Sequence, residues 1–228
     1  MNNRLKTIVK HIEDGIGVID VGTDHGYLPL ALVERGYSGK IIASDINEEP
    51  LNKARRNAAA ASADGCIDFR LSDGLESCSL HEVDTIVIAG MGGDTICGIL
   101  DRAEWCMAEG YKLIMQPMTK GEILRYWLAN NGFVITNEER VKENGSIYQI
   151  IVAVFKDNTV ISDGELFVGQ YELIKGNELF SEELEIFLKR FYRAADGMKG
   201  VTNKKALHGI YTNIIAELEE MRRKHGDS

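Results

Sequence analysis

The sequence has few cysteines, no long apolar run and no excess of positive charge. Its four cysteines, Cys66, Cys78, Cys97 and Cys106, are widely spaced and form no C-x-x-C pair, which argues against a metal site or a redox motif and predicts reduced thiols. No apolar run is long enough to cross a bilayer and no charged-then-apolar leader is present, so we expect a cytoplasmic protein. A net charge of −9 does not by itself indicate nucleic-acid binding.

The distribution of charge is more informative than its total. Positive residues crowd into one C-terminal stretch: Lys189, Arg190, Arg193, Lys199, Lys204 and Lys205. Such a cluster is either a solvated helix face balanced by neighbouring glutamates or a patch that contacts phosphates. We take Lys189, Arg190 and Arg193 as candidate substrate contacts.

The segment 18–27 carries the most informative motif of the sequence. Residues 18–21 read as a buried strand, residues 22–26 as a glycine-containing loop, and Tyr27 as the start of a helix with Pro29 in its first turn. A strand, a glycine loop and a helix start form the usual nucleotide pocket of doubly wound sheets.

Six further segments predict strands. Four of them, with helices between the strands, lie at 40–45, 66–71, 84–89 and 112–117. Two more, 133–141 and 146–155, flank a turn at 143–145 and read as an antiparallel hairpin. We therefore predict an α/β fold with a Rossmann-like, seven-stranded sheet, and by fold analogy the closing hairpin favours class I methyltransferases over dehydrogenases.

The sequence changes character beyond Asp157. A polar link around 161–176 precedes two segments whose apolar residues alternate steps of four and three: Leu184, Leu188, Phe191, Ala195 and Met198, then Leu207, Tyr211, Ile214, Leu218 and Met221. We predict a methyltransferase domain at 1–157 and a coiled-coil-like helical hairpin at 158–228, with Thr202 capping the second helix. The hairpin either packs on the domain or a dimer partner, or grips a large substrate.

The sequence of the glycine loop distinguishes between two candidate cofactors, NAD and S-adenosylmethionine. The dinucleotide fingerprint requires glycine at positions that Gly22, Asp24 and Tyr27 occupy, which argues against NAD. The methyltransferase pattern, acid-x-Gly-x-Gly-x-Gly, fits at Asp20, Gly22 and Gly26 and breaks only at Asp24. Because aspartate tolerates left-handed backbone better than most residues, we expect the loop to keep its shape.

Two acids and a glycine run follow later strands. Asp45, about twenty residues after the loop, is placed to hold ribose hydroxyls, and the alternative is a plain cap of the next helix. The turn at Asp73 and Gly74 could lie beside an adenine. The run 90–93, at the end of a central strand, indicates close approach by a ligand or a second backbone.

The glycine run also bears on the methyl acceptor. Enzymes that methylate an exocyclic amino group commonly carry Asp/Asn-Pro-Pro-aromatic after the fourth strand, where this sequence has Gly-Met-Gly-Gly at 90–93. A ring nitrogen such as adenine N1 already has an in-plane lone pair and needs no such acceptors. The base must still be turned out of any duplex.

The motifs at 20–29 and 89–93, with Gln116-Pro117, resemble the TrmK-type bacterial tRNA adenine-N1 methyltransferases, which act on adenosine 22. The resemblance covers nearly the whole chain and implies S-adenosylmethionine as methyl donor and tRNA as substrate. One departure is Met118, where the family often has asparagine, so a polar contact to the base from that position is not expected. The resemblance implies cofactor contacts from Asp20, Gly22, Asp24, His25, Gly26, Asp45, Ile46, Asn47, Asp73, Gly74, Gly90 and Met91.

Asp24 is the first candidate for catalysis, as an acceptor that orients the adenine amino group or takes its proton. His25 could stack or hydrogen-bond at the pocket mouth, and Tyr27 could stack on a flipped base beside Gln116 and Pro117. Each has a structural alternative: Asp24 as a helix cap, His25 as a structural residue and Tyr27 as core. Two other functions remain open, a methyltransferase for a small molecule or protein and a non-catalytic nucleotide-binding protein.

Overall fold

The structure, a computed structural model, describes residues 2–156, 159–198 and 205–226. The chain divides into two compact units, Met1–Thr159 and Val160–Ser228. The domain boundary that the sequence predicts, between 157 and 158, lies outside the described residues. None of the helices in the described ranges is both long enough and apolar enough to span a membrane.

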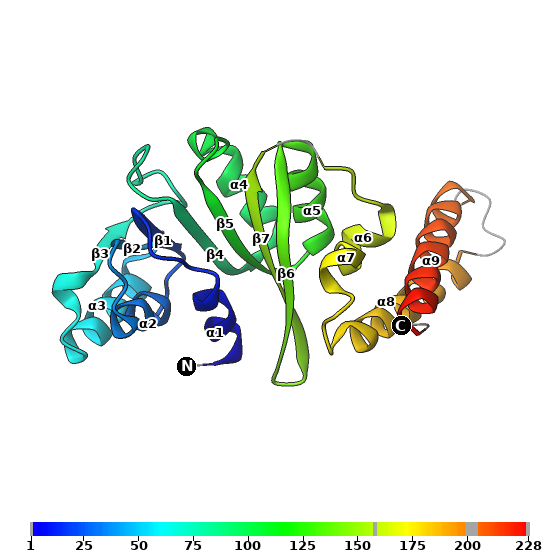
Figure 1. Cartoon of the computed structure of the whole chain (residues 1–228), viewed down its shortest axis with the longest axis horizontal. Helices are drawn as coiled ribbons and strands as arrows, with labels where there is room; N and C mark the ends of the chain where they lie inside the picture. Colours follow the sequence, from blue (N-terminus) through cyan, green and yellow to red (C-terminus); the bar gives the residue numbers. More distant parts are fainter. Residues whose placement is uncertain (1, 157–158, 199–204, 227–228) are drawn as a thin grey trace. The chain divides into compact units, whose positions relative to one another are not determined.

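The first unit is built on one seven-stranded sheet (Figure 1). The strands are β1 (Gly17–Val21), β2 (Lys40–Asp45), β3 (Asp68–Leu71), β4 (Thr85–Gly92), β5 (Lys112–Thr119), β6 (Phe133–Glu143) and β7 (Ser146–Phe155). Their order is β3-β2-β1-β4-β5-β7-β6, with β1 to β5 parallel and β7 antiparallel to both neighbours. The predicted Rossmann-like sheet with a closing hairpin is confirmed.

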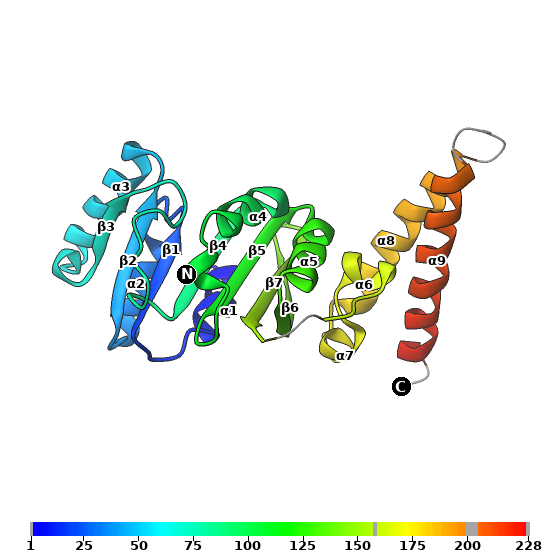
Figure 2. The same ribbon diagram turned by 90° about the horizontal axis from the view of Figure 1, so that it is seen from above.

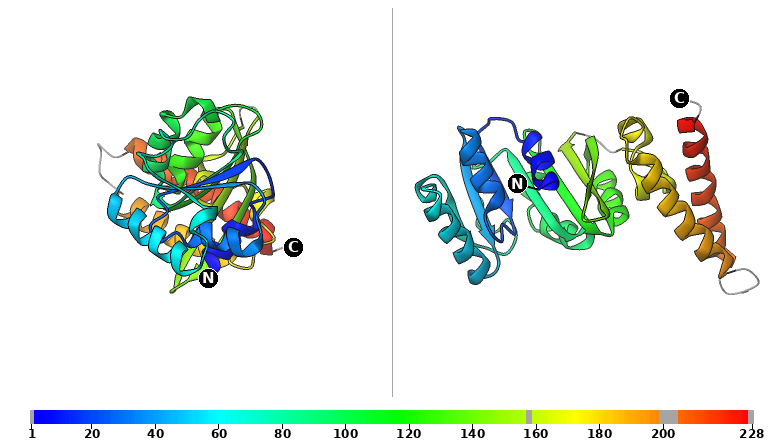
Figure 3. Two further views of the ribbon diagram at one scale, coloured as in Figure 1. Left: turned by 90° about the vertical axis from the view of Figure 1, so that its left-hand side faces the viewer. Right: turned by 90° about the horizontal axis from the view of Figure 1, so that it is seen from below.

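Helices cover both faces of this sheet (Figure 3). On one face, α1 (Asn3–Lys10), α2 (Tyr27–Arg35) and α3 (Glu48–Ala60) share a core with the strands. On the other, α4 (Gly93–Asp101) and α5 (Gly121–Asn130) pack on β4 and β5. Two short 3-10 turns, Asp64–Cys66 and Glu104–Cys106, complete the unit. Because β1 is covered on both faces, all five of its residues are buried.

Three sequence-based predictions need correction. Residues 72–84, all of them described, form turns and bends where a helix was expected between β3 and β4. The third strand begins at Asp68, since Cys66 belongs to a 3-10 turn. The glycine run continues β4 to Gly92 through a bulge between Ala89 and Met91, because Gly90 adopts φ +79°, which most side chains disfavour.

The cysteines are free thiols, as predicted. Cys66 is exposed and the other three are buried. Burial raises the pKa of Cys97 and of Cys106 to about 12, which keeps both thiols protonated at neutral pH.

The second unit is helical, with α6 (Asp163–Val168), α7 (Tyr171–Ile174), α8 (Phe180–Asp196) and α9 (Lys205–Gly226). Helices α8 and α9 lie side by side (Figure 2), and their shared core includes residues of both predicted heptad runs, such as Leu188 and Leu218. Residues 161–176 are more than a polar link, because α6 and α7 bury Val168 and Ile174 in the same core. Helices α6 and α7 are too short for a helical period of apolar residues to be recognised in the sequence. Thr202, the predicted cap, lies outside the described residues.

Candidate functional site

The loop after β1 has an unusual backbone that its sequence explains. Gly22 and Gly26 adopt φ +74° and +72°, and Asp24 between them adopts φ +48°. Aspartate is one of the few residues with a side chain that enter this left-handed region readily, so the expected loop shape is retained. The amides of Gly22 and Thr23 donate to the Ser44 carbonyl at 2.8 and 2.9 Å, which holds the loop against β2.

The two glycines of this loop have close neighbours as well as a backbone that other residues disfavour. A Cβ atom at Gly22 would lie 2.3 Å from Cε of Met91, and one at Gly26 would lie 3.0 Å from Cβ of Ala54. Gly22 therefore brings Met91 of β4 against the loop, and Gly26 lets α2 begin close to α3. Because the two glycines have no side chains, a ligand can approach the backbone of the loop closely.

Asp20, at the end of β1, is a buried acid. Burial raises its pKa, the Thr23 hydroxyl lowers it and repulsion from Asp45 raises it further, to about 6. A cationic or hydrogen-bond-donating group that bound beside Asp20 would lower this pKa again. Asp20 is therefore suited to a ligand that carries an ammonium group.

Asp45, at the end of β2, faces the same loop. Its Oδ2 accepts from the Asp24 amide at 3.4 Å and its Oδ1 from the Asn47 amide at 2.9 Å. The N-cap position of α3 is Asn47, which makes no side-chain capping bond, so Asp45 does not hold the N-cap position that the alternative gave it. Each carboxylate oxygen has a further lone pair to offer, as binding of adjacent hydroxyls requires. Ile46 beside it is 59% exposed.

The turn after β3 lies next to Asp45. The Ser72 amide donates to the Asp45 carbonyl at 2.9 Å, which fixes the start of the turn. The carboxylate of Asp73 accepts from Nη2 of Arg102 at 2.8 Å, and Gly74 adopts φ +59° over Ile99. Asp73 thus lies on the expected edge of the sheet with its side chain engaged by Arg102.

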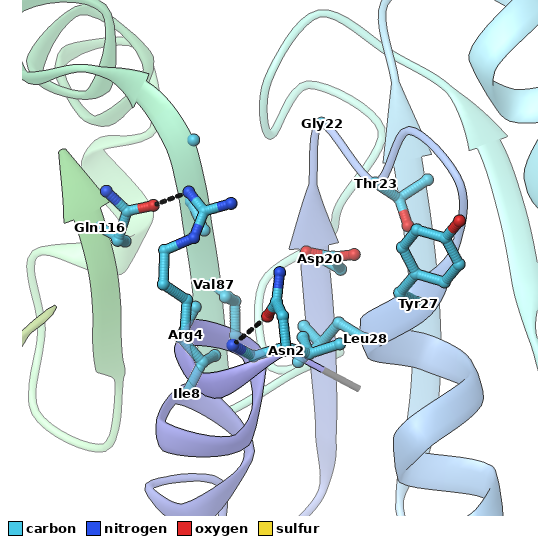
Figure 4. A pocket seen from close by; sticks show the side chains of 13 residues that line it. Asn2, Arg4, Ile8, Asp20, Gly22, Thr23, Tyr27, Leu28, Val87 and Gln116 are labelled. Carbon is cyan, nitrogen blue, oxygen red and sulfur yellow. Dashed lines mark hydrogen bonds between the residues drawn. The ribbon is translucent and has the colours of Figure 1, made fainter. Parts of the chain in front are cut away.

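A cavity of about 190 Å³ opens between β1 and β4 (Figure 4). Here the strand order reverses direction, the usual place for ligands in doubly wound sheets. Of the residues that the sequence predicts for the site, five line this cavity: Asp20, Gly22, Tyr27, Gly90 and Gln116. The other predicted site residues of the first unit lie at or after the carboxyl ends of β1 to β5 but do not line the cavity. They are Asp24, His25, Gly26, Asp45, Ile46, Asn47, Asp73, Gly74, Met91 and Pro117.

Asp24, His25 and Tyr27 form a cluster at the start of α2. Nε2 of His25 lies 3.4 Å from Oδ2 of Asp24, and the His25 and Tyr27 rings stack with centroids 5.3 Å apart. Helix α2 is capped by Gly26 without a side-chain bond, so Asp24 is not its cap. Tyr27 is 59% exposed and lines the cavity, so the core alternative for Tyr27 is also wrong.

Gln116, near the end of β5, lies on the opposite wall of the cavity, and Pro117 follows it without lining the cavity. Gln116 is only 1% exposed, and its Nε2 donates to the Pro117 carbonyl at 2.8 Å. Its Oε1 accepts from Nη1 of Arg4 at 3.1 Å. Met118 is 46% exposed and offers only a thioether sulfur, 3.5 Å from Nη1 of Arg4.

Two cavity residues, Asn2 and Arg4, were not identified from the sequence. Leu5 and Ile8 of the same helix also line the cavity. No local motif marks Arg4, because its partners lie more than a hundred residues away in the chain.

The candidate substrate cations Lys189, Arg190 and Arg193 belong to α8 in the second unit and are all exposed. In the same unit, Arg222 pairs with Glu185 and Glu219, whereas Arg223 and Lys224 pair with Glu220. Among the described residues of the hairpin, Arg222, Arg223 and Lys224 are thus held by glutamates, whereas no salt bridge is found for the three α8 cations.

Comparisons with known proteins agree with this architecture. The sequence matches the methyltransferase domain family over residues 1–151. It is 32% identical over 192 residues to the tRNA (adenine(22)-N(1))-methyltransferase of Bacillus subtilis strain 168, covering 84% of this chain and 79% of that protein.

Solved structures of the same kind contain the methyl donor or its product. M. capricolum TrmK in complex with S-adenosyl-homocysteine superposes with a TM-score of 0.80 at 27% identity, covering 99% of this chain and 98% of that one. Streptococcus pneumoniae Sp1610 in complex with S-adenosyl-L-methionine gives a TM-score of 0.77 at 29% identity, covering 97% and 99%. The chain therefore belongs to the class I methyltransferases and, among them, to the family of bacterial tRNA (adenine(22)-N(1))-methyltransferases.

Proposed function

We propose that this protein transfers a methyl group from S-adenosylmethionine to N1 of adenosine 22 in tRNA. The observation that carries the proposal is the cavity between β1 and β4, which joins the glycine loop to a wall formed by Gln116 and Arg4. One side of this cavity suits a nucleotide-like cofactor and the other offers polar groups to a base. The Bacillus subtilis relative is named for this reaction. A tRNA substrate implies a cytoplasmic protein.

The residues of the loop region fit S-adenosylmethionine, which when bound supplies a methyl group on a sulfonium. We assign Asp45 to the ribose hydroxyls, because its carboxylate is buried and keeps free lone pairs. Asp20 suits the ammonium of the methionine part, because a cation would relieve the repulsion between Asp20 and Asp45. Gly22 and Gly26 allow close approach of the ligand to backbone.

The transfer is an in-line displacement that needs positioning more than acid–base chemistry. The N1 lone pair of adenine forms the new bond to the methyl carbon while the carbon–sulfur bond breaks and sulfur keeps its electron pair. The positive charge moves from sulfur to the purine, where the 6-amino group shares it. We assign the carboxylate of Asp24 to that amino group, where it would stabilise the developing charge. His25 and Tyr27 would support the flipped base by stacking.

Nucleoside analysis tests the reaction directly. The protein is incubated with methyl-labelled S-adenosylmethionine and an unmodified tRNA transcript, which is then digested to nucleosides. We expect label in 1-methyladenosine, and none when adenosine 22 is replaced by uridine. Label in any other nucleoside, or in small molecules or proteins supplied in place of tRNA, would overturn the proposal in favour of a different methyltransferase activity.

We further propose that the helical hairpin holds tRNA through Lys189, Arg190 and Arg193. Phosphate contacts release counterions, so each contact steepens the dependence of affinity on salt. Replacing all three by glutamine should weaken tRNA binding and make the slope of log affinity against log salt shallower by about 2 to 3. Binding measured at several salt concentrations gives this slope, and S-adenosylhomocysteine affinity should stay unchanged.

The matched control removes three cations that glutamates already hold in the same unit. Arg222, Arg223 and Lys224 are replaced by glutamine, and we expect a smaller change in the salt slope. Equal slopes for the two triple variants would refute a specific role for the α8 cations.

A further inference from the structure

Arg4 is held from three strands of the sheet. Its side chain rises from the first turn of α1 and is 26% exposed. Nη1 donates to Oε1 of Gln116 on β5, Nε lies 3.6 Å from Oε1 of Glu143 at the end of β6, and the guanidinium carbon lies 4.5 Å from the centre of the Tyr148 ring on β7. Figure 4 shows this side chain reaching Gln116 on the side of the cavity opposite Tyr27. The guanidinium is therefore well fixed in position.

This fixed guanidinium determines the orientation of the Gln116 amide. Arginine can only donate hydrogen bonds, so Gln116 must turn its carbonyl oxygen toward Arg4. The amide nitrogen then donates to the Pro117 carbonyl at 2.8 Å, and both contacts select the same orientation. Because Gln116 is almost completely buried, few water molecules can compete with Arg4 for its carbonyl oxygen.

An oriented carbonyl in this wall can recognise one feature of a purine. The oxygen of Gln116 has a second lone pair, and Gln116 lines the cavity. Adenine carries an amino donor on C6 beside N1, whereas guanine and hypoxanthine carry a carbonyl there and a proton on N1. An acceptor beside the C6 position therefore favours adenine, and Met118, with its weakly accepting sulfur, is a poor substitute for it.

We propose that Arg4 is a positioning residue that presents the Gln116 carbonyl to the 6-amino group of the target adenine and so selects adenine as the methyl acceptor. This inference rests on the proposed function. It adds to that function a residue of the N-terminal helix that contacts neither the methyl group nor N1.

The test compares two methyl acceptors on the same enzyme preparation. One tRNA carries adenosine at position 22 and the other carries purine ribonucleoside, which keeps N1 and lacks the 6-amino group. We expect native kcat/KM to favour adenosine by at least about 10- to 100-fold, because purine ribonucleoside leaves the buried Gln116 acceptor without its hydrogen bond. In Arg4→Met and in Gln116→Leu, this preference should fall by about 10-fold or more, and what remains is the share that Asp24 supplies through the same amino group.

The ratio distinguishes positioning from a general structural role. Both acceptors are measured on one preparation, so the fraction of folded protein cancels from the ratio. Arg4→Lys retains one donor and should keep part of the preference, which maintains the test if Arg4→Met is unstable. Lys10→Met is the control on the same helix, since Lys10 is exposed and pairs with Glu139 rather than with a cavity residue, and its ratio should equal the native one.

Two results would overturn the inference: a native preference close to unity, or an undiminished preference in Arg4→Met. Either result leaves the proposed function standing as long as the native enzyme forms 1-methyladenosine. Failure of the native enzyme to methylate the adenosine-containing tRNA would instead refute the proposed function itself.

Discussion

Replacing Asp24 by glycine is expected to reduce methyl transfer by about 10²- to 10³-fold, the range for loss of one group that stabilises charge in the transition state. Glycine adopts the φ of +48° found at this position without strain, and it restores the loop pattern usual in methyltransferases. The substitution therefore removes the carboxylate while leaving the backbone cradle in place. Affinity for S-adenosylhomocysteine, measured by calorimetry, should change by no more than a few-fold.

Two further substitutions separate charge from backbone conformation. Asparagine tolerates left-handed backbone about as well as aspartate, so Asp24→Asn removes only the charge and should be impaired to a similar degree. Asp24→Ala should abolish transfer and also strain the loop, at a cost of about 1–2 kcal/mol. Cofactor affinity that falls in parallel with activity in Asp24→Gly would make Asp24 a cofactor-binding or folding residue. Full activity in Asp24→Gly would rule out a catalytic carboxylate.

Much of the first unit follows from local sequence. Each strand is a short apolar run bounded by turn residues, and the parallel order follows from the helices between most of them. The predictions fail where local and tertiary preferences diverge. Gly90 and Gly92 look like loop residues, yet pairing with β5 keeps them in β4 through a bulge. Similarly, α6 and α7 are too short to show periodicity, and their apolar residues become meaningful only in the core they share with α8 and α9.

The cofactor side of the site was more predictable than the acceptor side. Loop glycines and strand-end acids are local signals at fixed spacing, and Asp20, Gly22 and Asp45 lie together as expected. The acceptor wall depends on contacts between distant segments. Arg4 meets Gln116 across 112 positions of sequence, and a single sequence carries no signal for such a pair. The exposure of Tyr27 could not be foreseen either, because an aromatic residue in a first helical turn is equally compatible with a core position.

Glu138 is the centre of a buried charge cluster whose loss should destabilise the first unit strongly. Its side chain is fully buried, with Oε1 2.9 Å from Nε of Arg125 and Oε2 3.0 Å from Nη1 of Arg140. Burial raises the pKa of Glu138, but attraction to the two arginines outweighs burial and holds the pKa below its ordinary value. The carboxylate is thus charged at neutral pH and links α5 to β6.

Glu138→Gln is expected to lower the free energy of unfolding by about 3–5 kcal/mol, because it removes the charge of a buried carboxylate that two buried guanidinium groups share. Denaturant titration gives this value. The control is Glu139→Gln on the same strand, where the carboxylate is partly exposed and contacts the exposed Lys10 and the ring of His11, so the loss should be about 1 kcal/mol. Equal losses in the two variants would contradict a special role for the buried cluster.

The pH dependence of stability provides an independent check on Glu138. Because folding lowers the pKa of this carboxyl, its contribution is complete above the ordinary value of 4.5 and is lost as pH falls through the lower folded value. The stability difference between the native protein and Glu138→Gln should therefore be largest at neutral pH and shrink below about pH 4.5. Arg125 also contacts Gln149, and both lie against Gly121, where α5 begins next to Pro117. The cluster thus supports the strand end that carries Gln116, so Glu138→Gln should also reduce the preference for adenosine over purine ribonucleoside at position 22.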